Sequence, residues 1–157
     1  MDPRHLPPDF REFLECFNAA GVEYLLVGGH AVSFHGYPRV TSDMDLWIHR
    51  TPENAERAVH AIRQFFGDDP EGLVREQLLD PENVTHFGAR PFLIEILNRI
   101  SGADFDQAWA RRVRTVYDTV PVNLLGIEDL LLNKRASGRA KDLADLENLP
   151  KELPSAP

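Results

Sequence analysis

The 157-residue sequence is poor in cysteine and in long apolar runs, and each shortage excludes a class of protein. It contains one cysteine, so an internal disulfide cannot form and a disulfide-stapled scaffold is excluded. No apolar run approaches the roughly 18 residues of a membrane-spanning helix, and the opening MDPRHLPPDF lacks a signal-peptide core. We therefore expect a cytoplasmic protein without a membrane partner.

Positive charge is also scarce. Lysine and arginine total 17 against 25 aspartate and glutamate residues, which gives a formal net charge of -8. This charge repels the phosphate backbone, so duplex DNA is not expected as a partner and phosphate must be bound by a local group of cations. The length fits a single domain over residues 1–149, followed by a proline-containing tail at 150–157.

Apolar spacing and turn residues predict helices that alternate with short strands. Thr51 is expected to cap the clearest helix, with Pro52 at its first position. The predicted helices are 10–20, 30–34, 52–66, 105–111, 127–136 and 139–146, and the predicted strands are 22–27, 84–87, 92–97, 114–117, 120–124 and one that carries Asp43 and Asp45. This order predicts an α/β (α+β) fold, a small mixed β-sheet with helices packed on it.

Two aspartates stand one residue apart in GGHAVSFHGYPRVTSDMDLW. In an extended segment, Asp43 and Asp45 share one side with Arg39 and Thr41. Close carboxylates repel each other unless a divalent cation holds both ionised, so the pair predicts Mg²⁺ or Mn²⁺. The alternative is a pair of solvated aspartates on an edge strand. Arg39 and Thr41 would either contact phosphate or order Asp43.

The same stretch begins with a glycine pair, Gly28 and Gly29, where a strand passes into a helix. Without side chains, their N–H groups can approach phosphate oxygens closely. A plain tight turn is the alternative interpretation of the pair.

Glu95 is the one charge within the apolar stretch FLIEIL. A buried carboxylate is costly without a partner. That partner is either a metal ion shared with Asp43 and Asp45, in which case Glu95 could also accept a proton from an attacking hydroxyl, or an ion pair with Arg90 or Arg99.

Taken together, these motifs resemble the DNA polymerase β-like nucleotidyltransferase superfamily. More closely, GYPRVTSDMDLW, FLIEIL followed by FDQAW, and NKRASGRAKDLADL resemble compact bacterial nucleotidyltransferases related to the AbiEii toxins of toxin–antitoxin systems and to antibiotic nucleotidyltransferases. The resemblance covers about residues 22–147. The family commonly has aspartate at the third carboxylate position, where this chain has glutamate.

The resemblance implies transfer of a nucleoside monophosphate from an NTP, with ATP expected, to a hydroxyl acceptor, with release of pyrophosphate. It implies that Gly28 and Gly29 cradle the nucleotide phosphates and that Asp43 and Asp45 bind two metal ions. Glu95 would be the third carboxylate.

A local basic cluster lies in NKRASGRAKD. Lys134 and Lys141 are the expected phosphate ligands at the rim of a pocket, because the resemblance runs through this segment. The alternative is a solvated helix face on which Arg139 and Lys141 pair with Asp142 and Asp145.

The acceptor stays open among a small molecule, a protein side chain and an RNA end. Two other functions also stay open, namely a non-catalytic nucleotide- or partner-binding module of the same fold and a metal-dependent phosphohydrolase. Cys16, Trp47 and Trp109 are expected to belong to the core. The histidines His30, His35 and His86 are expected to be packing or loop residues.

Overall fold

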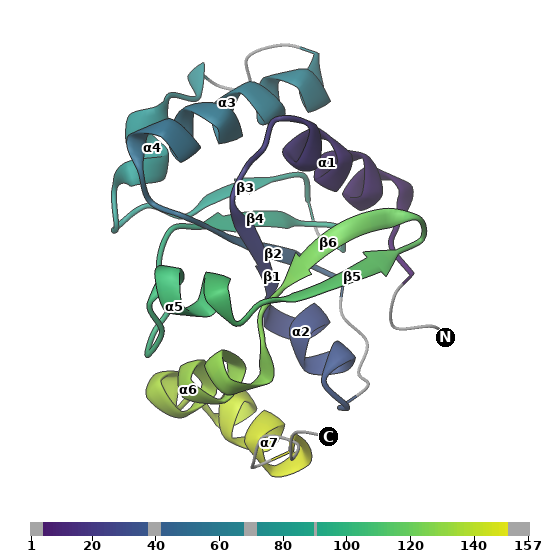
Figure 1. The fold of residues 1–157 in the computed structure, drawn as a ribbon, viewed down its shortest axis with the longest axis vertical. Helices are drawn as coiled ribbons and strands as arrows, with labels where there is room; N and C mark the ends of the chain where they lie inside the picture. The colour runs from purple at the N-terminus through teal and green to yellow at the C-terminus, as the bar shows by residue number, and fades with distance from the viewer. Residues whose placement is uncertain (1–4, 38–41, 68–71, 90, 151–157) are drawn as a thin grey trace.

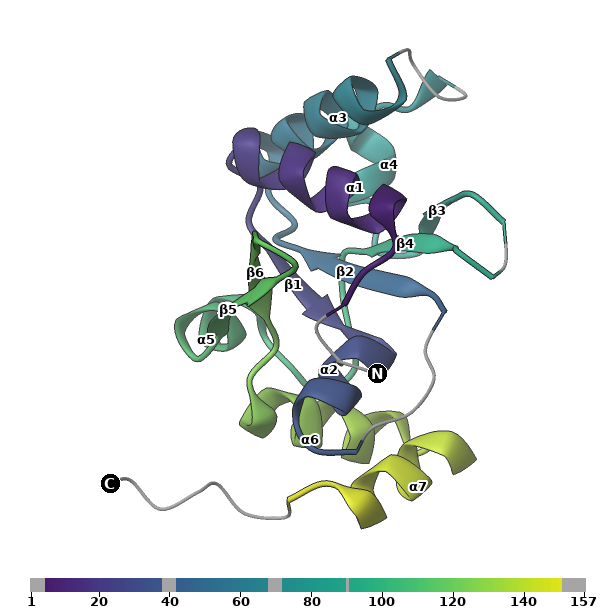
Figure 2. The same ribbon diagram turned by 90° about the vertical axis from the view of Figure 1, so that its right-hand side faces the viewer.

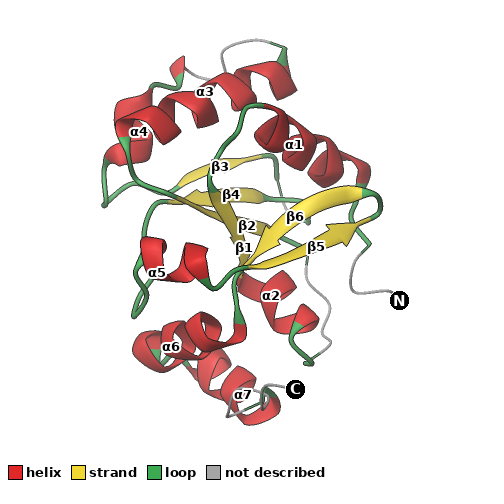
Figure 3. Cartoon of the chain, in the orientation of Figure 1, coloured by secondary structure: helices red, strands yellow, loops and turns green. Residues whose placement is uncertain are grey.

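The computed structural model describes residues 5–37, 42–67, 72–89 and 91–150, which form one mixed sheet flanked by helices (Figures 1 and 3). The elements in chain order are α1 (Pro8–Ala19), β1 (Tyr24–Val27), α2 (Gly28–Phe34), β2 (Met44–Ile48), α3 (Pro52–Phe66), α4 (Arg75–Leu79), β3 (Thr85–Phe87), β4 (Ile94–Leu97), α5 (Phe105–Ala110), β5 (Val113–Tyr117), β6 (Val120–Leu124), α6 (Ile127–Ser137) and α7 (Ala140–Asn148). No helix in these ranges combines the length and the apolar character needed to span a membrane.

The six strands within the described ranges follow the order β3-β4-β2-β1-β6-β5. The β1 strand is antiparallel to β2 and parallel to β6, and β2 is parallel to β4. The β3 and β5 strands lie at the edges, each antiparallel to its neighbour. The predicted mixed sheet is therefore confirmed.

Helices cover the sheet on both sides. The α1, α3 and α4 helices lie on one side, and α2, α5, α6 and α7 lie on the other in both views (Figures 1 and 2). Side chains of a strand alternate between faces, and β1 shows this directly. Tyr24 and Leu26 join the core under α1 and α3, whereas Leu25 and Val27 join the core under α2, α5 and α6.

The α3 helix shows why local prediction succeeds in this chain. The Thr51 hydroxyl accepts a hydrogen bond from the Asn54 N–H at 3.3 Å, and Pro52 occupies the first helical position. The apolar stripe of the helix is buried against the sheet, and Gly67 ends it with φ of +70°. The helix ends match those predicted.

The α4 helix lies in a segment for which the sequence patterns predict neither a helix nor a strand. Its segment REQLL is a single turn with little apolar periodicity, so tertiary contacts stabilise it. Leu78 is buried in the core, and the Gln77 side chain accepts a hydrogen bond from the Val74 N–H at 3.0 Å. The Asn98 amide donates to the Leu78 carbonyl at 3.0 Å, which satisfies an oxygen at the helix end.

Candidate active site

Two of the predicted carboxylates meet on neighbouring strands. The β2 and β4 strands run parallel, and Asp45 and Glu95 are directly paired in the register. Asp43 directly precedes β2. Met44 and Leu46 point into the core under α1 and α3, so Asp45 points to the opposite side of the sheet, toward α6 and α7.

The environment of Asp45 favours its protonated form. Burial raises the pKa of Asp45 to about 7, and a hydrogen bond with Glu95 and the charges of Glu95 and Asp43 act in the same direction. The positive charge of Lys141 acts to lower this pKa. A hydrogen bond between two carboxyl groups needs a proton on one of them, so the bond with Glu95 favours the protonated form of Asp45.

Gly28 is required by the position of Asp45. Val27 pairs with Asp45 in the register of β1 and β2, so the next residue passes close to that carboxylate. Gly28 has φ of +67°, and a Cβ atom built on it would collide with Asp45 Oδ2. The first glycine of the pair therefore lets the main chain lie against the acidic site, which a plain turn would not require.

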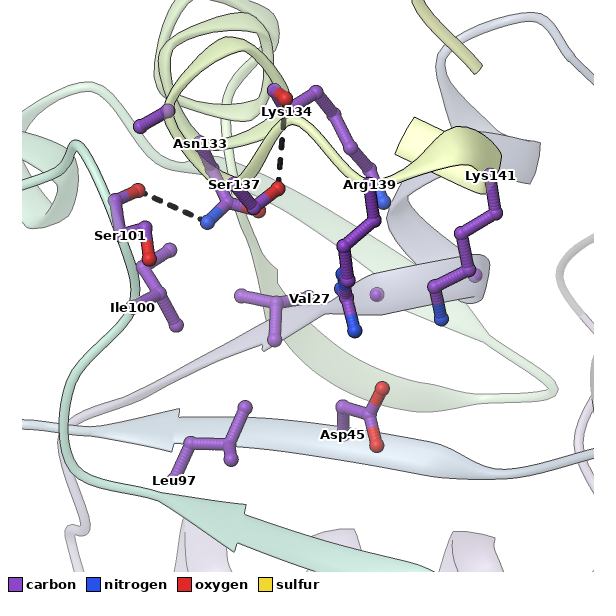
Figure 4. A pocket seen from close by; sticks show the side chains of 13 residues that line it. Val27, Asp45, Leu97, Ile100, Ser101, Asn133, Lys134, Ser137, Arg139 and Lys141 are labelled. Atoms are coloured by element: carbon purple, nitrogen blue, oxygen red, sulfur yellow. Dashed lines mark hydrogen bonds between the residues drawn. The ribbon is translucent and has the colours of Figure 1, made fainter. Parts of the chain in front are cut away.

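A cleft of about 480 Å³ opens beside these residues. Figure 4 shows Arg139 and Lys141 extending from the α7 end toward Asp45 on the sheet. The lining residues are Val27, Gly28, Gly29, Asp45, Leu97, Ile100, Ser101, Asn133, Lys134, Ala136, Ser137, Arg139 and Lys141. The cleft therefore brings together the predicted glycines, one predicted carboxylate and the basic segment.

Lys134 does not lie at the rim, as the sequence had suggested. It is 4% exposed, and its Nζ atom pairs with Asp142 Oδ1 at 3.0 Å and Asp145 Oδ2 at 3.1 Å. Burial acts to raise the pKa of Asp142, but hydrogen bonds from Arg139, Lys134 and Ser137 hold that pKa below its usual range. We call these five residues the α6–α7 clamp, because they join the two helices.

The clamp also orients the predicted cations. The Arg139 Nε atom donates to Asp142 Oδ2 at 2.8 Å, as the alternative of helix-face pairing predicted. Its side chain is nevertheless 64% exposed and extends into the cleft, and Lys141 is exposed as well (Figure 4). Among the described residues, Arg139 and Lys141 are thus the exposed cations that face Asp45.

The other predicted residues have mixed outcomes. Arg39 and Thr41 lie outside the described residues, as do Arg90 and residues 151–157 of the tail. The Arg99 Nη2 atom lies 3.6 Å from Glu82 Oε1 in an exposed ion pair. Arg99, one of the two arginines suggested as a partner of Glu95, is therefore paired with another carboxylate. The predicted packing role is confirmed for Trp47, which is buried, and for Cys16, which packs against the core.

His30 has a closer relation to the acidic site than its sequence context indicated. Burial lowers the pKa of His30 to about 4, and its ring forms a hydrogen bond with the Asp43 backbone. The Nε2 atom is buried without a hydrogen-bond partner among the described residues. This neutral imidazole supports the segment that carries Asp43, and no motif in the sequence signals the contact.

The donor chemistry at Asp45 and Glu95 fits a hard divalent cation. The Oδ1 atom of Asp45 is buried and has no hydrogen-bond partner among the described residues. No group of three or more His, Cys, Asp and Glu side chains in the described ranges is arranged to hold one ion, so the three-carboxylate set stays a prediction. Mg²⁺ commonly binds through one or two carboxylates and substrate phosphates, and Asp45 and Glu95 meet that requirement.

Comparison with known proteins identifies the fold. No protein-family model and no curated protein sequence matches the chain. Among solved structures, the "putative nucleotidyltransferase (TM1012)" of Thermotoga maritima superposes with a TM-score of 0.55 and 14% identity, over 91% of this chain and 92% of that one. An antigenic nucleotidyltransferase-like protein from Paracoccidioides brasiliensis has a TM-score of 0.49 and 17% identity, over 91% and 75%. The first of these similarities, together with the sheet order and the paired carboxylates, shows that this chain has a nucleotidyltransferase fold.

Proposed function

We propose that the protein transfers a nucleoside monophosphate from an NTP, with ATP the expected donor, to a hydroxyl acceptor and releases pyrophosphate. The observation that carries this proposal is the cleft in which Asp45 faces Arg139 and Lys141 beside the glycine pair. A carboxylate opposite two cations is suited to a substrate that brings both phosphates and a metal ion.

Each described residue of the cleft has a role in this proposal. Arg139 and Lys141 bind triphosphate oxygens, and the N–H groups of Gly28 and Gly29 donate hydrogen bonds to phosphate oxygens that lie close to the main chain. Lys134 acts through the α6–α7 clamp, which holds the α7 end in place. Arg39 and Thr41 keep their proposed phosphate role from the sequence.

Asp45 and Glu95 are the proposed holders of Mg²⁺ or Mn²⁺, with Asp43 as a further ligand. When bound, the metal supplies charge neutralisation for the triphosphate. Glu95 accepts the proton of the attacking hydroxyl, because it pairs with Asp45 at the centre of the acidic site. The bond formed is between the hydroxyl oxygen and the α-phosphorus. The bond broken is between the α-phosphorus and the oxygen that bridges to the β-phosphate, so pyrophosphate leaves.

A labelling experiment tests the proposal. The protein is incubated with each α-labelled NTP, Mg²⁺ and a cell extract, and products are separated into small molecules, RNA and protein. We expect label in one of these acceptor classes, and an Asp45→Asn variant should lower transfer on the order of 10³-fold.

The same experiment separates the other functions. Release of labelled nucleoside monophosphate without an acceptor would indicate a phosphohydrolase. Nucleotide binding without any turnover would indicate a binding module. Transfer at a tenth or more of the parent rate by Asp45→Asn would contradict the assignment of Asp45. The acceptor class found would also test the resemblance to the AbiEii-type and antibiotic-modifying enzymes.

A further inference from the structure

The cleft has two ends of different chemistry. One end carries Gly28, Gly29, Asp45, Arg139 and Lys141, and we call it the charged end. The other end is lined by Leu97, Ile100, Ser101 and Asn133, and we call it the neutral end because none of these four side chains is charged. Figure 4 shows Asp45, Arg139 and Lys141 on one side of Val27, and the four side chains of the neutral end on the other side.

The neutral end is held in shape by close packing between the loop after β4 and the α6 helix. The Asn133 amide donates to the Ser101 carbonyl at 3.0 Å. One residue later, Gly102 has φ of +76°, and a Cβ atom on it would lie 2.6 Å from Ala136 Cβ and 2.7 Å from the Leu132 carbonyl oxygen. The loop can approach α6 this closely only because residue 102 is glycine.

We propose that the neutral end binds the nucleobase of the nucleotide whose phosphates occupy the charged end. This inference rests on the proposed function and adds the location of the base. A nucleobase is flat and uncharged, so Leu97 and Ile100 can cover its faces. The Ser101 hydroxyl and the Asn133 Oδ1 atom, which the hydrogen bond between these two residues does not use, can reach its polar edge.

The charge distribution argues against placing a charged acceptor at this end. A cationic acceptor needs carboxylates, and an RNA end needs further cations, and the four side chains of the neutral end supply neither. A nucleotide has an anionic triphosphate and an uncharged base, which match the cations of the charged end and the uncharged side chains of the neutral end.

Binding measurements with two ligands test the inference. ATP and inorganic tripolyphosphate are titrated in Mg²⁺ by calorimetry against the full chain. Tripolyphosphate probes the charged end alone, whereas ATP probes both ends. We expect ATP to bind the parent protein at least about tenfold more tightly than tripolyphosphate.

Three variants assign that difference to the neutral end. Gly102→Ala, which displaces the loop, and the milder Ile100→Ala, which removes apolar contact, should each lose most of the advantage of ATP while the dissociation constant of tripolyphosphate changes less than about twofold. Gly21→Ala is the matched control, because Gly21 has φ of +70° but no atom within 4 Å of the added Cβ. It should bind both ligands like the parent.

The failures are distinguishable. If tripolyphosphate binds as tightly as ATP, the base does not use the cleft and the inference is overturned, while the charged end keeps its role. If neither ligand binds the parent protein, the proposed function itself fails. Equal weakening of both ligands by Ile100→Ala would also overturn the inference, because the residue would then serve the whole cleft.

Discussion

At the residue scale, the acidic site holds more negative charge than its surroundings favour. Asp45 is partly buried beside Glu95 and Asp43, and the positive charge of Lys141 opposes their effect on it. A site of this kind is destabilising when it is empty and becomes favourable when a cation or a phosphate-bound metal ion enters. The strain of the empty site is therefore measurable as a dependence of stability on pH.

We predict that Asp45→Asn stabilises the metal-free protein at pH 8. The pKa of Asp45 is raised from 3.8 to about 7 by folding, so the folded state binds the extra proton and the free energy of unfolding falls as pH rises between these values. The variant lacks this titration, so its free energy of unfolding at pH 8 should be higher than that of the parent by about 1 kcal/mol or more. At pH 4 the two free energies should be equal. Denaturant titrations in EDTA measure both values.

Addition of Mg²⁺ provides the control for that measurement. It should stabilise the parent at pH 8 and have little effect on Asp45→Asn. A constant difference between the two proteins from pH 4 to pH 8 would contradict the origin of the effect in this carboxyl group.

At position 95, we expect transfer to depend on the presence of a carboxylate more than on the length of the side chain that carries it. Glu95→Gln should lose transfer to the same degree as Asp45→Asn, because an amide neither accepts the hydroxyl proton nor carries charge. Glu95→Asp should keep part of the activity, since it retains the carboxylate. A Glu95→Gln variant with full transfer and only a lower melting temperature would assign Glu95 to structure.

At the element scale, the sequence allowed a solvent-exposed basic face on the last two helices. The structure has a buried ion-pair group there instead, the α6–α7 clamp. Breaking a buried pair by removal of one partner leaves an uncompensated charge, at a cost of about 3–5 kcal/mol. The clamp is therefore the feature that most directly connects the stability of α7 with the placement of Arg139 and Lys141.

We predict that Lys134→Met lowers the free energy of unfolding by about 3 kcal/mol, because Asp142 and Asp145 lose their shared cation. Arg135→Met, on the same helix but exposed, is the matched control and should change stability by less than about 0.5 kcal/mol. Lys141→Met should leave stability near that of the parent and weaken tripolyphosphate binding. If Lys134→Met instead unfolds like the parent and loses tripolyphosphate, Lys134 is a phosphate ligand.

Local patterns predicted most elements because their signals lie within one segment, as in the capped and striped α3 helix. The α4 helix could not be predicted in this way, since the Leu78 core contact and the Asn98 hydrogen bond come from tertiary structure. The acidic pair, the glycines and Glu95 could be selected from the sequence by their residue types. The pairing of Asp45 with Glu95 could not be predicted, because it depends on β2 and β4 being neighbours in the sheet.

The same distinction separates Lys134 from Lys141. Both stand in one basic segment, and no local signal shows which amine faces a carboxylate of α7. The neutral end is harder still to predict, because Ser101 and Asn133 are 32 residues apart and neither belongs to a recognisable motif.

At the scale of the whole molecule, the cleft is built from segments distant in the chain. One side comes from Val27, the glycine pair and Asp45, a second part comes from the end of β4 and the loop after it (Leu97, Ile100 and Ser101), and the helical side comes from α6 and the start of α7. A bound nucleotide would bridge these two parts and stabilise the folded chain by mass action, by about 2.7 kcal/mol at a concentration 100 times the dissociation constant. The chain has a net charge of -8, so the exposed cations Arg139 and Lys141 form a positive group on a protein that is negative overall.

The burial of Lys134 has a consequence for amine chemistry. The lysines of the sequence are Lys134, Lys141 and Lys151. An acylating reagent needs an accessible, uncharged amine, so Lys141 should acylate at least about tenfold faster than Lys134, whose Nζ atom lies in two ion pairs. Peptide mass spectrometry after a short pulse measures both rates. Saturating ATP with Mg²⁺ should protect Lys141, and denaturant should expose Lys134, so one reagent would footprint ligand occupancy and unfolding at separate sites; equal native rates would refute the clamp.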